Sequence, residues 1–472
     1  MRNFIEKLFK VKENNSSLKI EMLAGVTTFL SMAYILAVNP AILSAAGMER
    51  GGVLIATALA AFFGTIFMAL LANYPFALAP SMGLNAYFAY TVVKSMGYSY
   101  QVALFAVFIE GFIFLLLSLT SVREMIFNAI PLPLKKASGI GIGLFIAFIA
   151  FQNAHIIEGN DTTLVTFQKL VDDEFHTKGI AAILAISGIL FTAWMITKKV
   201  KGAILFGILI TWFLGIACEL AGVYHISKEP GFASLIPDLS TGGISKAFSE
   251  FKNLFSSAFE YTRWSKTGAK ESGFAMLFSM NFVTVILAFL FVDLFSAIGT
   301  FTGVASQAGL LDENGKLPKI KGAFMADSLA TSIGAVLGTS TTTTYVESAT
   351  GVVEGGKTGF TAITTAFLFL LSIFFAPLLL AVPSFATAPA LVIVGFYMIT
   401  PIRELDFSDI GEAIPAYLTI IVMPFAYSIT DGISIGIITW TLLNALIGKW
   451  KRLSPLMLIL TALFLANYFL LK

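Results

Sequence analysis

Long apolar segments, separated by short polar connections, follow one another along almost the whole chain. Most are about 17–25 residues long, which is the length that an α-helix needs to cross a bilayer. The pattern predicts fourteen membrane-spanning segments, at 20–38, 52–71, 75–94, 101–120, 137–152, 179–197, 202–222, 275–303, 322–338, 345–356, 359–381, 388–401, 411–428 and 431–448. The expected fold class is therefore an all-α polytopic membrane protein.

The composition supports this class. Apolar residues make up 57% of the 472 residues and charged residues only 12%, roughly half the charged share of a soluble domain. Residues 1–19 are polar and basic and lack the apolar core of a cleavable signal sequence. The single Cys218 excludes an intramolecular disulfide, and the 3 histidines fall in or beside connections, so no metal site is expected.

The distribution of lysine and arginine predicts the orientation. Basic residues gather in 1–19 and in alternate connections such as 198–201, whereas the connection 153–178 is acidic. Since cytoplasmic loops carry an excess of Lys and Arg, we expect a cytoplasmic N-terminus and an extracytoplasmic connection at 223–274. The additional apolar segment at 453–472 either spans the membrane or lies in its interface.

Two segments interrupt the apolar pattern in a similar way. Residues 338–356 are rich in glycine and hydroxyls and carry Glu347, and residues 74–87 contain two prolines ahead of Asn85. Irregular backbone at membrane depth is tolerated only where protein buries it or it lines a cavity. We expect broken helices in segments 3 and 10, with an extended piece (339–344 in the second) leading to a half-helix whose N-terminal amides face a ligand. The alternative for the second stretch is a Ser/Thr-rich surface loop.

The two breaks fall at matching positions of an internal repeat. One offset of 262 residues separates Asn85 from Glu347 and also Ser31 from Asp293. Seven segments in each half give the halves opposite orientations. The sequence thus predicts a 7+7 inverted repeat, a common architecture of secondary transporters.

Asp293 and Glu347 are carboxylates in apolar or hydroxyl-rich surroundings. An ionisable residue at membrane depth indicates a functional site by default, and Ser296 adds a hydroxyl one helical turn after Asp293. Buried carboxylates can change protonation at ordinary pH, as a proton-coupled carrier requires. We expect both to bind substrate and to carry the coupled proton; the alternative for Asp293 is a role in helix packing.

Further residues near the breaks complete the candidate site. Asn85 offers donors and an acceptor to a ligand edge that presents both, or else bonds a neighbouring helix. Gly83 lets the backbone approach a flat ligand, and Tyr345 can stack on a ring. Asp327 is expected to brace the broken tenth segment, and Glu354 to be solvated at its inner end. The other candidate substrate-binding residues are Ser31, Ser296, Thr344 and Ser348.

Four motifs resemble the signatures of the AzgA-like purine permeases, a branch of the nucleobase–cation symporter 2 (nucleobase–ascorbate) superfamily. In chain order they are Glu21–Pro40, Ala79–Tyr87, Phe291–Thr300 and Thr341–Gly351. The resemblance runs from about residue 20 to residue 450, and four motifs in the right order make it specific.

The resemblance implies an organisation into two domains. A core would comprise 20–120 and 275–381, and a gate 137–222 and 388–448. Members of the superfamily form homodimers through the gate and move the core as an elevator. The apolar tail at 453–472 lies outside this shared fold.

The resemblance also implies a substrate and the residues that bind it. Hypoxanthine, guanine or adenine would be carried with protons, and the family's substrate-binding asparagine, aspartate and glutamate fall on Asn85, Asp293 and Glu347. Relatives commonly carry a second aspartate where this chain has Ser296. That departure assigns coupling to Asp293 and Glu347.

The expected function is proton-coupled uptake of purine bases, with hypoxanthine or guanine first, across the inner (plasma) membrane. The expected partners are the base, protons, the lipid bilayer and a second copy of the chain, with no nucleic acid and no cofactor besides the coupling proton. The alternatives are an adenine permease of the same family and an anion transporter of the same fold, which would favour Lys or Arg at mid-membrane. An enzyme would need a nucleophile with a histidine or a metal set inside the spans, and the sequence shows neither.

Overall fold

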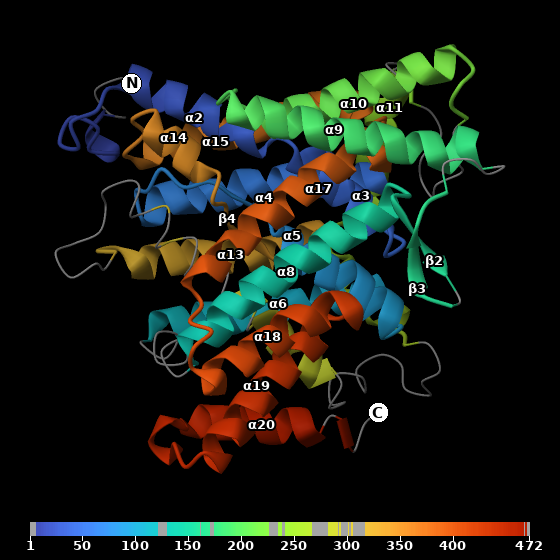
Figure 1. Cartoon of the computed structure of the whole chain (residues 1–472). Coiled ribbons are helices and arrows are strands. Elements are labelled where there is room, and N and C mark those ends of the chain that lie inside the picture. Colours follow the sequence, from blue (N-terminus) through green and yellow to red (C-terminus); the bar gives the residue numbers. More distant parts are fainter. Residues whose placement is uncertain are drawn as a thin grey trace.

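The computed structural model describes residues 6–120, 130–160, 162–169, 174–225, 235–237, 241–266, 282–290, 292–293, 301, 304, 317–466 and 468–469. Within these residues, ten helices are long and apolar enough to cross a membrane, and two further apolar helices are shorter. Most of the long helices run in a similar direction and pack side by side (Figure 1). The protein is thus an all-helical membrane protein, as the apolar pattern predicts.

The first half of the chain follows the predicted segments closely. Its elements are α2 (Leu18–Met32), α3 (Ile35–Ser44), α4 (Arg50–Leu71), β1 (Leu78–Pro80), α5 (Met82–Ala86), the π-helix η1 (Tyr87–Ser95), α6 (Tyr100–Leu119), α8 (Leu132–Asn153), the hairpin β2 (Ile157–Asn160) and β3 (Leu164–Phe167), η2 (Phe175–Gly179), α9 (Ile180–Thr197) and α10 (Ala203–Leu220). Two boundaries differ by five residues or more, because the first segment extends to Ser44 across the junction of α2 and α3, and α8 begins at Leu132 rather than at 137.

The second half adds the remaining elements. They are α11 (Thr241–Leu254), η3 (Ser257–Phe259), η4 (Tyr261–Arg263), α13 (Ile320–Leu337), β4 (Thr342–Thr344), α14 (Ser348–Val353), α15 (Gly359–Ser372), η6 (Ile373–Phe375), α16 (Ala376–Leu380), α17 (Ser384–Ile399), η7 (Thr400–Glu404), α18 (Ile410–Phe425), α19 (Ile429–Leu446), η8 (Trp450–Arg452) and α20 (Pro455–Ala466). The predicted segment 275–303 lies partly outside the described residues, and 282–290 and 292–293 within it are helical.

Glu21 connects the first helix to a helix of the second half. Its carboxylate is fully buried and accepts hydrogen bonds from the backbone N–H groups of Lys357 and Thr358, each at 3.2 Å, and from the Thr361 hydroxyl. These donors lie at the start of α15, where backbone N–H groups have no partner within the helix. A carboxylate beside a helix N-terminus is also favoured by the helix dipole. Glu21 therefore fixes α15 against α2.

Glycines allow close helix packing around α8. A Cβ on Gly143 would lie 2.7 Å from the Cβ of Met398 on α17, and a Cβ on Gly141 would lie 3.2 Å from the Thr419 carbonyl of α18. Distances this short leave no room for a larger residue, so α8 approaches both helices through its glycine face. Small residues at such positions are typical of helix contacts in membranes.

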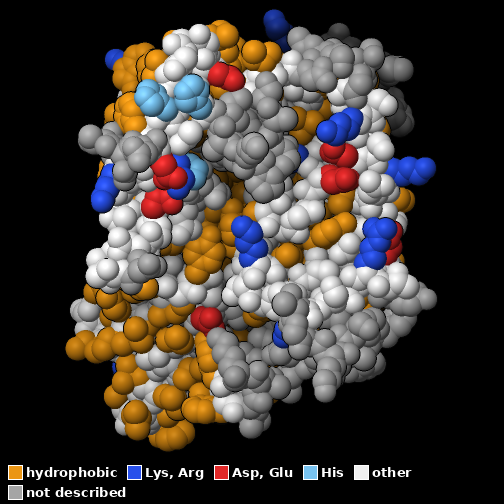
Figure 2. Space-filling model, turned by 90° about the vertical axis from the view of Figure 1, so that its right-hand side faces the viewer, with side chains coloured by type: hydrophobic (Ala, Val, Ile, Leu, Met, Phe, Trp, Pro, Cys, Tyr) orange, Lys and Arg blue, Asp and Glu red, His pale blue; other side chains and the backbone are white. Residues whose placement is uncertain are grey.

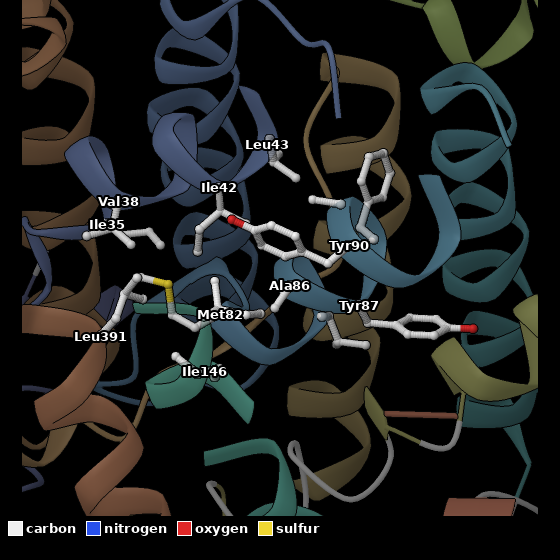
Figure 3. Packing of buried hydrophobic residues seen from close by; sticks show 14 of the residues in the cluster. Ile35, Val38, Ile42, Leu43, Met82, Ala86, Tyr87, Tyr90, Ile146 and Leu391 are labelled. Atoms are coloured by element: carbon white, nitrogen blue, oxygen red, sulfur yellow. The ribbon is translucent and has the colours of Figure 1, made fainter. Parts of the chain in front are cut away.

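Buried apolar side chains from both proposed domains meet in one cluster. Ile35 and Val38 of α3 and Met82 of α5 lie near Ile146 of α8 and Leu391 of α17 (Figure 3). The first three belong to the expected core and the last two to the expected gate. The boundary between the two sets of segments is therefore apolar at this place.

The long connection 223–274 contains a helix that packs on the bundle. The Glu250 side chain of α11 accepts the backbone N–H of Gly51, at the start of α4, at 2.8 Å. Beyond α11, the Ser256 N–H bonds the Val336 carbonyl of α13 at 2.7 Å.

The end of the molecule that carries the β2–β3 hairpin shows dispersed charged and histidine side chains, whereas hydrophobic side chains dominate the lower left of the same view (Figure 2).

The apolar C-terminal stretch forms α20, which runs antiparallel to α19. Thr461 donates to the Thr441 hydroxyl at 2.8 Å, and Tyr468 donates to Asp431, at the start of α19, at 2.6 Å. The order of these two contacts is reversed along the two segments. The chain after Ser454 therefore follows α19 over most of its length, and α20, with 12 residues, is one of the two shorter apolar helices.

Candidate substrate-binding site

The two predicted breaks form a two-stranded antiparallel ribbon. Leu78 pairs with Thr344 and Pro80 with Thr342. β-Branched threonines favour extended backbone, and all six strand residues are buried. Buried backbone groups need partners: the Leu78 N–H bonds the Thr65 hydroxyl at 2.9 Å, and the Thr331 hydroxyl bonds the Thr342 carbonyl at 3.1 Å. The expected extended piece and half-helix are confirmed, and the surface-loop alternative is wrong.

The half-helices leave the ribbon from opposite ends. α5 follows β1 beyond Pro80, and α14 follows β4 beyond Thr344, which lies opposite Leu78. At ~3.4 Å per residue, three paired residues make a ribbon about 7 Å long. The polar residues of α5 and of the start of α14 therefore lie at the two ends of a short, buried ribbon.

Asn85 lies at the α5 end and is fully buried. Its Oδ1 accepts a hydrogen bond from the Ser340 hydroxyl, just ahead of β4. Within the described part of the chain, Asn85 Nδ2 has no hydrogen-bond partner. A buried polar atom without a partner costs ~1–3 kcal/mol, so this amide is suited to donate to an acceptor on a bound substrate.

Glu347 lies at the other end, at the N-cap of α14, and is partly buried. Its Oε1 accepts a hydrogen bond of 2.7 Å from the Tyr34 hydroxyl. Between the two ends, the Tyr345 hydroxyl donates to the Pro80 carbonyl, and the Tyr345 side chain is buried. Since Tyr345 follows β4 and reaches the last residue of β1, its ring extends along the ribbon from one end to the other.

The remaining predicted site residues have varied contacts. Ser31 donates to the Thr27 carbonyl of its own helix at 3.0 Å. The Ser348 hydroxyl accepts the Ala77 N–H at 2.9 Å and so joins α14 to the start of β1. Thr344 pairs with Leu78, and its buried hydroxyl has no partner within the described residues. Gly83 faces Ile142 of α8, whose Cγ2 would lie 2.6 Å from a Cβ at this glycine.

The other two acidic candidates, Asp293 and Asp327, are both buried in helices of the second half. Asp293 is helical and fully buried, while Ser296 lies outside the described residues. Asp327 is fully buried in α13, one turn before Thr331, which bonds the ribbon. The bracing role expected for Asp327 stays a prediction.

Glu354 is only partly solvated, whereas the sequence predicts a solvated residue at this end of the half-helix. It lies at the C-cap of α14 and forms an ion pair of 2.5 Å with Lys201, between α9 and α10, and its side chain is only 23% exposed. A lysine near a helix C-terminus also complements the helix dipole. α14 is thus tied to a segment of the other proposed domain.

Two polar contacts of the site were not predicted from the sequence. Glu110 of α6 is fully buried, and its Oε2 accepts the Thr341 hydroxyl at 2.7 Å, directly beside Ser340. A lone carboxylate in the apolar run 101–120 was a usable signal, because an ionisable residue at membrane depth is expensive. Tyr34 gave no such signal, since its importance arises from a contact with a residue 313 positions away.

Comparison with known sequences decides the family. Residues 19–435 match the sequence profile Xan_ur_permease, described as "Permease family". The chain belongs to this permease family. It is therefore a multi-pass membrane transporter rather than an enzyme, and the resemblance found in its motifs is confirmed.

Relatives and a solved structure extend this result. The "Putative permease MJ0326" of Methanocaldococcus jannaschii is 43% identical over 98% of both chains. "Guanine/hypoxanthine permease PbuO" of Bacillus subtilis is 41% identical over 98% of this chain and 100% of its own length, and "Adenine permease AdeP" of Escherichia coli is 37% identical over 98% and 96%. The transmembrane domain of the cyanobacterial bicarbonate transporter BicA shares the fold, with a TM-score of 0.62, 13% identity, and coverage of 89% of this chain and 97% of that one.

Proposed function

We propose that this permease is a proton-coupled purine nucleobase symporter of the inner (plasma) membrane, with hypoxanthine or guanine as its substrate. The observation that carries the proposal is the polarity of the ribbon, which has the Asn85 amide donor at one end and the Glu347 carboxylate at the other. The names of PbuO and AdeP, aligned over nearly the whole chain, support a purine substrate.

The chemistry of a purine base suits this pair of groups. Hypoxanthine and guanine present ring N–H donors together with carbonyl and ring-nitrogen acceptors on one planar molecule. A carboxylate accepts from such N–H groups, and an amide N–H donates to such acceptors. The Tyr345 ring between the two ends offers an aromatic surface for stacking. An adenine permease uses the same two groups on a different edge and is the close alternative.

An anion carrier of the same fold fits the site less well. It would need Lys or Arg, or bare amides, beside the bound anion, whereas the two half-helices and their flanking residues contribute Asn85 and Glu347. A carboxylate at the site repels an anionic substrate and leaves a neutral base or a cation as the natural ligand.

Coupling would involve Glu347 and Asp293. If a proton and a base bind cooperatively, each raises the affinity for the other by the same factor, and a proton gradient then drives accumulation of the base. In this proposal fourteen spans form an inverted repeat, the core (20–120 and 275–381) moves against the gate (137–222 and 388–448), and the gate joins two copies of the chain.

Uptake of labelled hypoxanthine by cells that lack their own purine carriers tests the proposal. Unlabelled guanine, adenine, xanthine and uracil serve as competitors, with and without a protonophore. We expect competition by guanine and loss of accumulation with the protonophore. Strong competition by adenine would assign the chain to the adenine branch, and no uptake of any base would contradict a purine substrate.

A further inference from the structure

The first spanning segment is interrupted at the point where it meets Glu347. α2 ends at Met32, α3 begins at Ile35, and Tyr34 at the junction is only 1% exposed. Its hydroxyl donates to Glu347 Oε1 at 2.7 Å. Ala33 and Tyr34 keep helical backbone angles, so the junction brings Tyr34 to the N-cap of α14 without an extended break like those of the ribbon.

Close packing of α14 on α2 fixes the geometry of this contact. A Cβ on Gly351 of α14 would lie 2.1 Å from the Thr28 Oγ1 and 2.7 Å from the Ala24 carbonyl, both on α2. Thr28 precedes Tyr34 by less than two helical turns, and Gly351 follows Glu347 by about one. Because the two helices touch at these small residues, Tyr34 and Glu347 are held at a set separation.

We propose that Tyr34 is a positioning residue for substrate recognition, which orients the Glu347 carboxylate without touching the base. A glutamate side chain has several rotamers of similar energy, and a partly exposed one samples them. The hydroxyl of Tyr34 holds one carboxylate oxygen, so that the carboxylate keeps one orientation toward an N–H group of the base. This inference rests on the proposed function, since it assumes that Glu347 accepts from a purine.

The inference differs from a purely structural role in one measurable way. If Tyr34 only fills space at the helix junction, removal of its hydroxyl affects binding independently of Glu347. If it acts through the carboxylate, its effect depends on that carboxylate. Two residues in direct contact that act together show non-additive effects, and a double-mutant cycle measures this coupling.

The test is equilibrium binding of labelled hypoxanthine to the purified full-length protein, for wild type, Tyr34→Phe, Glu347→Ala and the double variant. We expect Tyr34→Phe to weaken binding about tenfold, the usual effect of losing a hydrogen bond to a charged group. In the Glu347→Ala protein, which has no side-chain acceptor for the Tyr34 hydroxyl, the same change should have less than a twofold effect. Melting curves of all four proteins verify that they are folded.

The chain offers a matched control in Tyr74→Phe. Tyr74 is also buried, at 5% exposure, and its hydroxyl accepts the Lys319 N–H at 3.0 Å, away from Glu347. This control should bind hypoxanthine as wild type does. Equal losses from Tyr34→Phe in both backgrounds would overturn the positioning role alone. Absence of binding to wild type by any purine would overturn the proposed function, and the role of Tyr34 with it.

Discussion

The half-helices α5 and α14 leave one ribbon from its two opposite ends, and they differ in burial and charge. Every residue of α5 is buried, and the helix continues directly into the π-helix η1. α14 has six residues, exposes Val353 at 76%, and has a carboxylate at each end, Glu347 and Glu354. Two related elements thus provide a neutral, enclosed donor and an acidic, more accessible acceptor. In a symporter, the second is the natural place for a proton to enter.

The two half-helices also contact the proposed gate differently. α5 meets α8 through Gly83 and Ile142, which is an apolar contact that depends on the missing side chain. α14 meets the α9–α10 connection through the Glu354–Lys201 ion pair, in which the lysine is 54% exposed. Exposed ion pairs contribute only ~0–1 kcal/mol, so the charged contact can break and re-form easily. A core that moves against the gate could break and re-form the exposed ion pair, while the buried contact at Gly83 remains apolar and excludes water.

The largest effect should come from tying α14 to the gate covalently. Cys218 is replaced by serine, and Lys201→Cys and Glu354→Cys are then joined by a short bifunctional thiol reagent. A reagent is used because two residues whose long side chains form an ion pair have Cα atoms farther apart than a disulfide can bridge. If α14 moves against the α9–α10 connection in each cycle, the cross-link should abolish uptake in reconstituted vesicles. Binding of the base should persist.

A matched control uses the ion pair between Lys136 of α8 and Glu404 of η7, 2.7 Å apart. Lys136 lies on α8, one residue before the gate range 137–222, and Glu404 lies within 388–448, so the same reagent on Lys136→Cys and Glu404→Cys should leave uptake unchanged. Full transport by the verified 201–354 cross-link would contradict motion between these parts of the molecule. Loss of transport in both proteins would contradict the division into core and gate.

The next-largest effects distinguish the acceptor end of the ribbon, at Glu347, from its donor end, at Asn85. Glu347→Gln keeps hydrogen-bonding capacity but removes the titrating group, so the variant should exchange base across vesicles yet no longer accumulate it against a gradient. Asn85→Ala removes only a donor, and we expect about 10- to 100-fold weaker binding with accumulation still driven by protons. Uptake at several external pH values measures both. Accumulation by Glu347→Gln with normal pH dependence would rule out this carboxylate as the coupling group.

Much of the fold was predictable because its signals are local. The apolar run predicted at 52–71 corresponds to Arg50–Leu71, and the hydroxyl-rich stretch gave both the extended piece and the half-helix of segment 10. Membrane thickness fixes helix length, and irregular backbone at membrane depth is rare enough to be recognised. Asn85 and Glu347 were identifiable as polar residues at these interruptions.

The contacts that orient the site were not predictable, because they depend on tertiary structure. The interruption at Ala33 and Tyr34 carries no glycine or proline, and its partner Glu347 is distant in sequence. The Lys201 pairing of Glu354 was missed because a charge at the end of a span is usually solvated. Sequence pattern thus predicts which polar residues lie within the membrane, whereas packing decides which group each one contacts.

The smallest effect tests whether Gly83 serves the gate contact or the substrate. In Gly83→Ala the new Cβ would lie 2.6 Å from Ile142 Cγ2, and overpacking of this kind typically costs ~1–3 kcal/mol. We expect a several-fold lower maximal uptake rate with little change in affinity for the base. Ile142→Ala in the same chain should restore the rate, because it removes the clashing methyl. If affinity falls instead and Ile142→Ala does not restore it, Gly83 acts through close approach of its backbone to the base, and both half-helices then contact substrate directly.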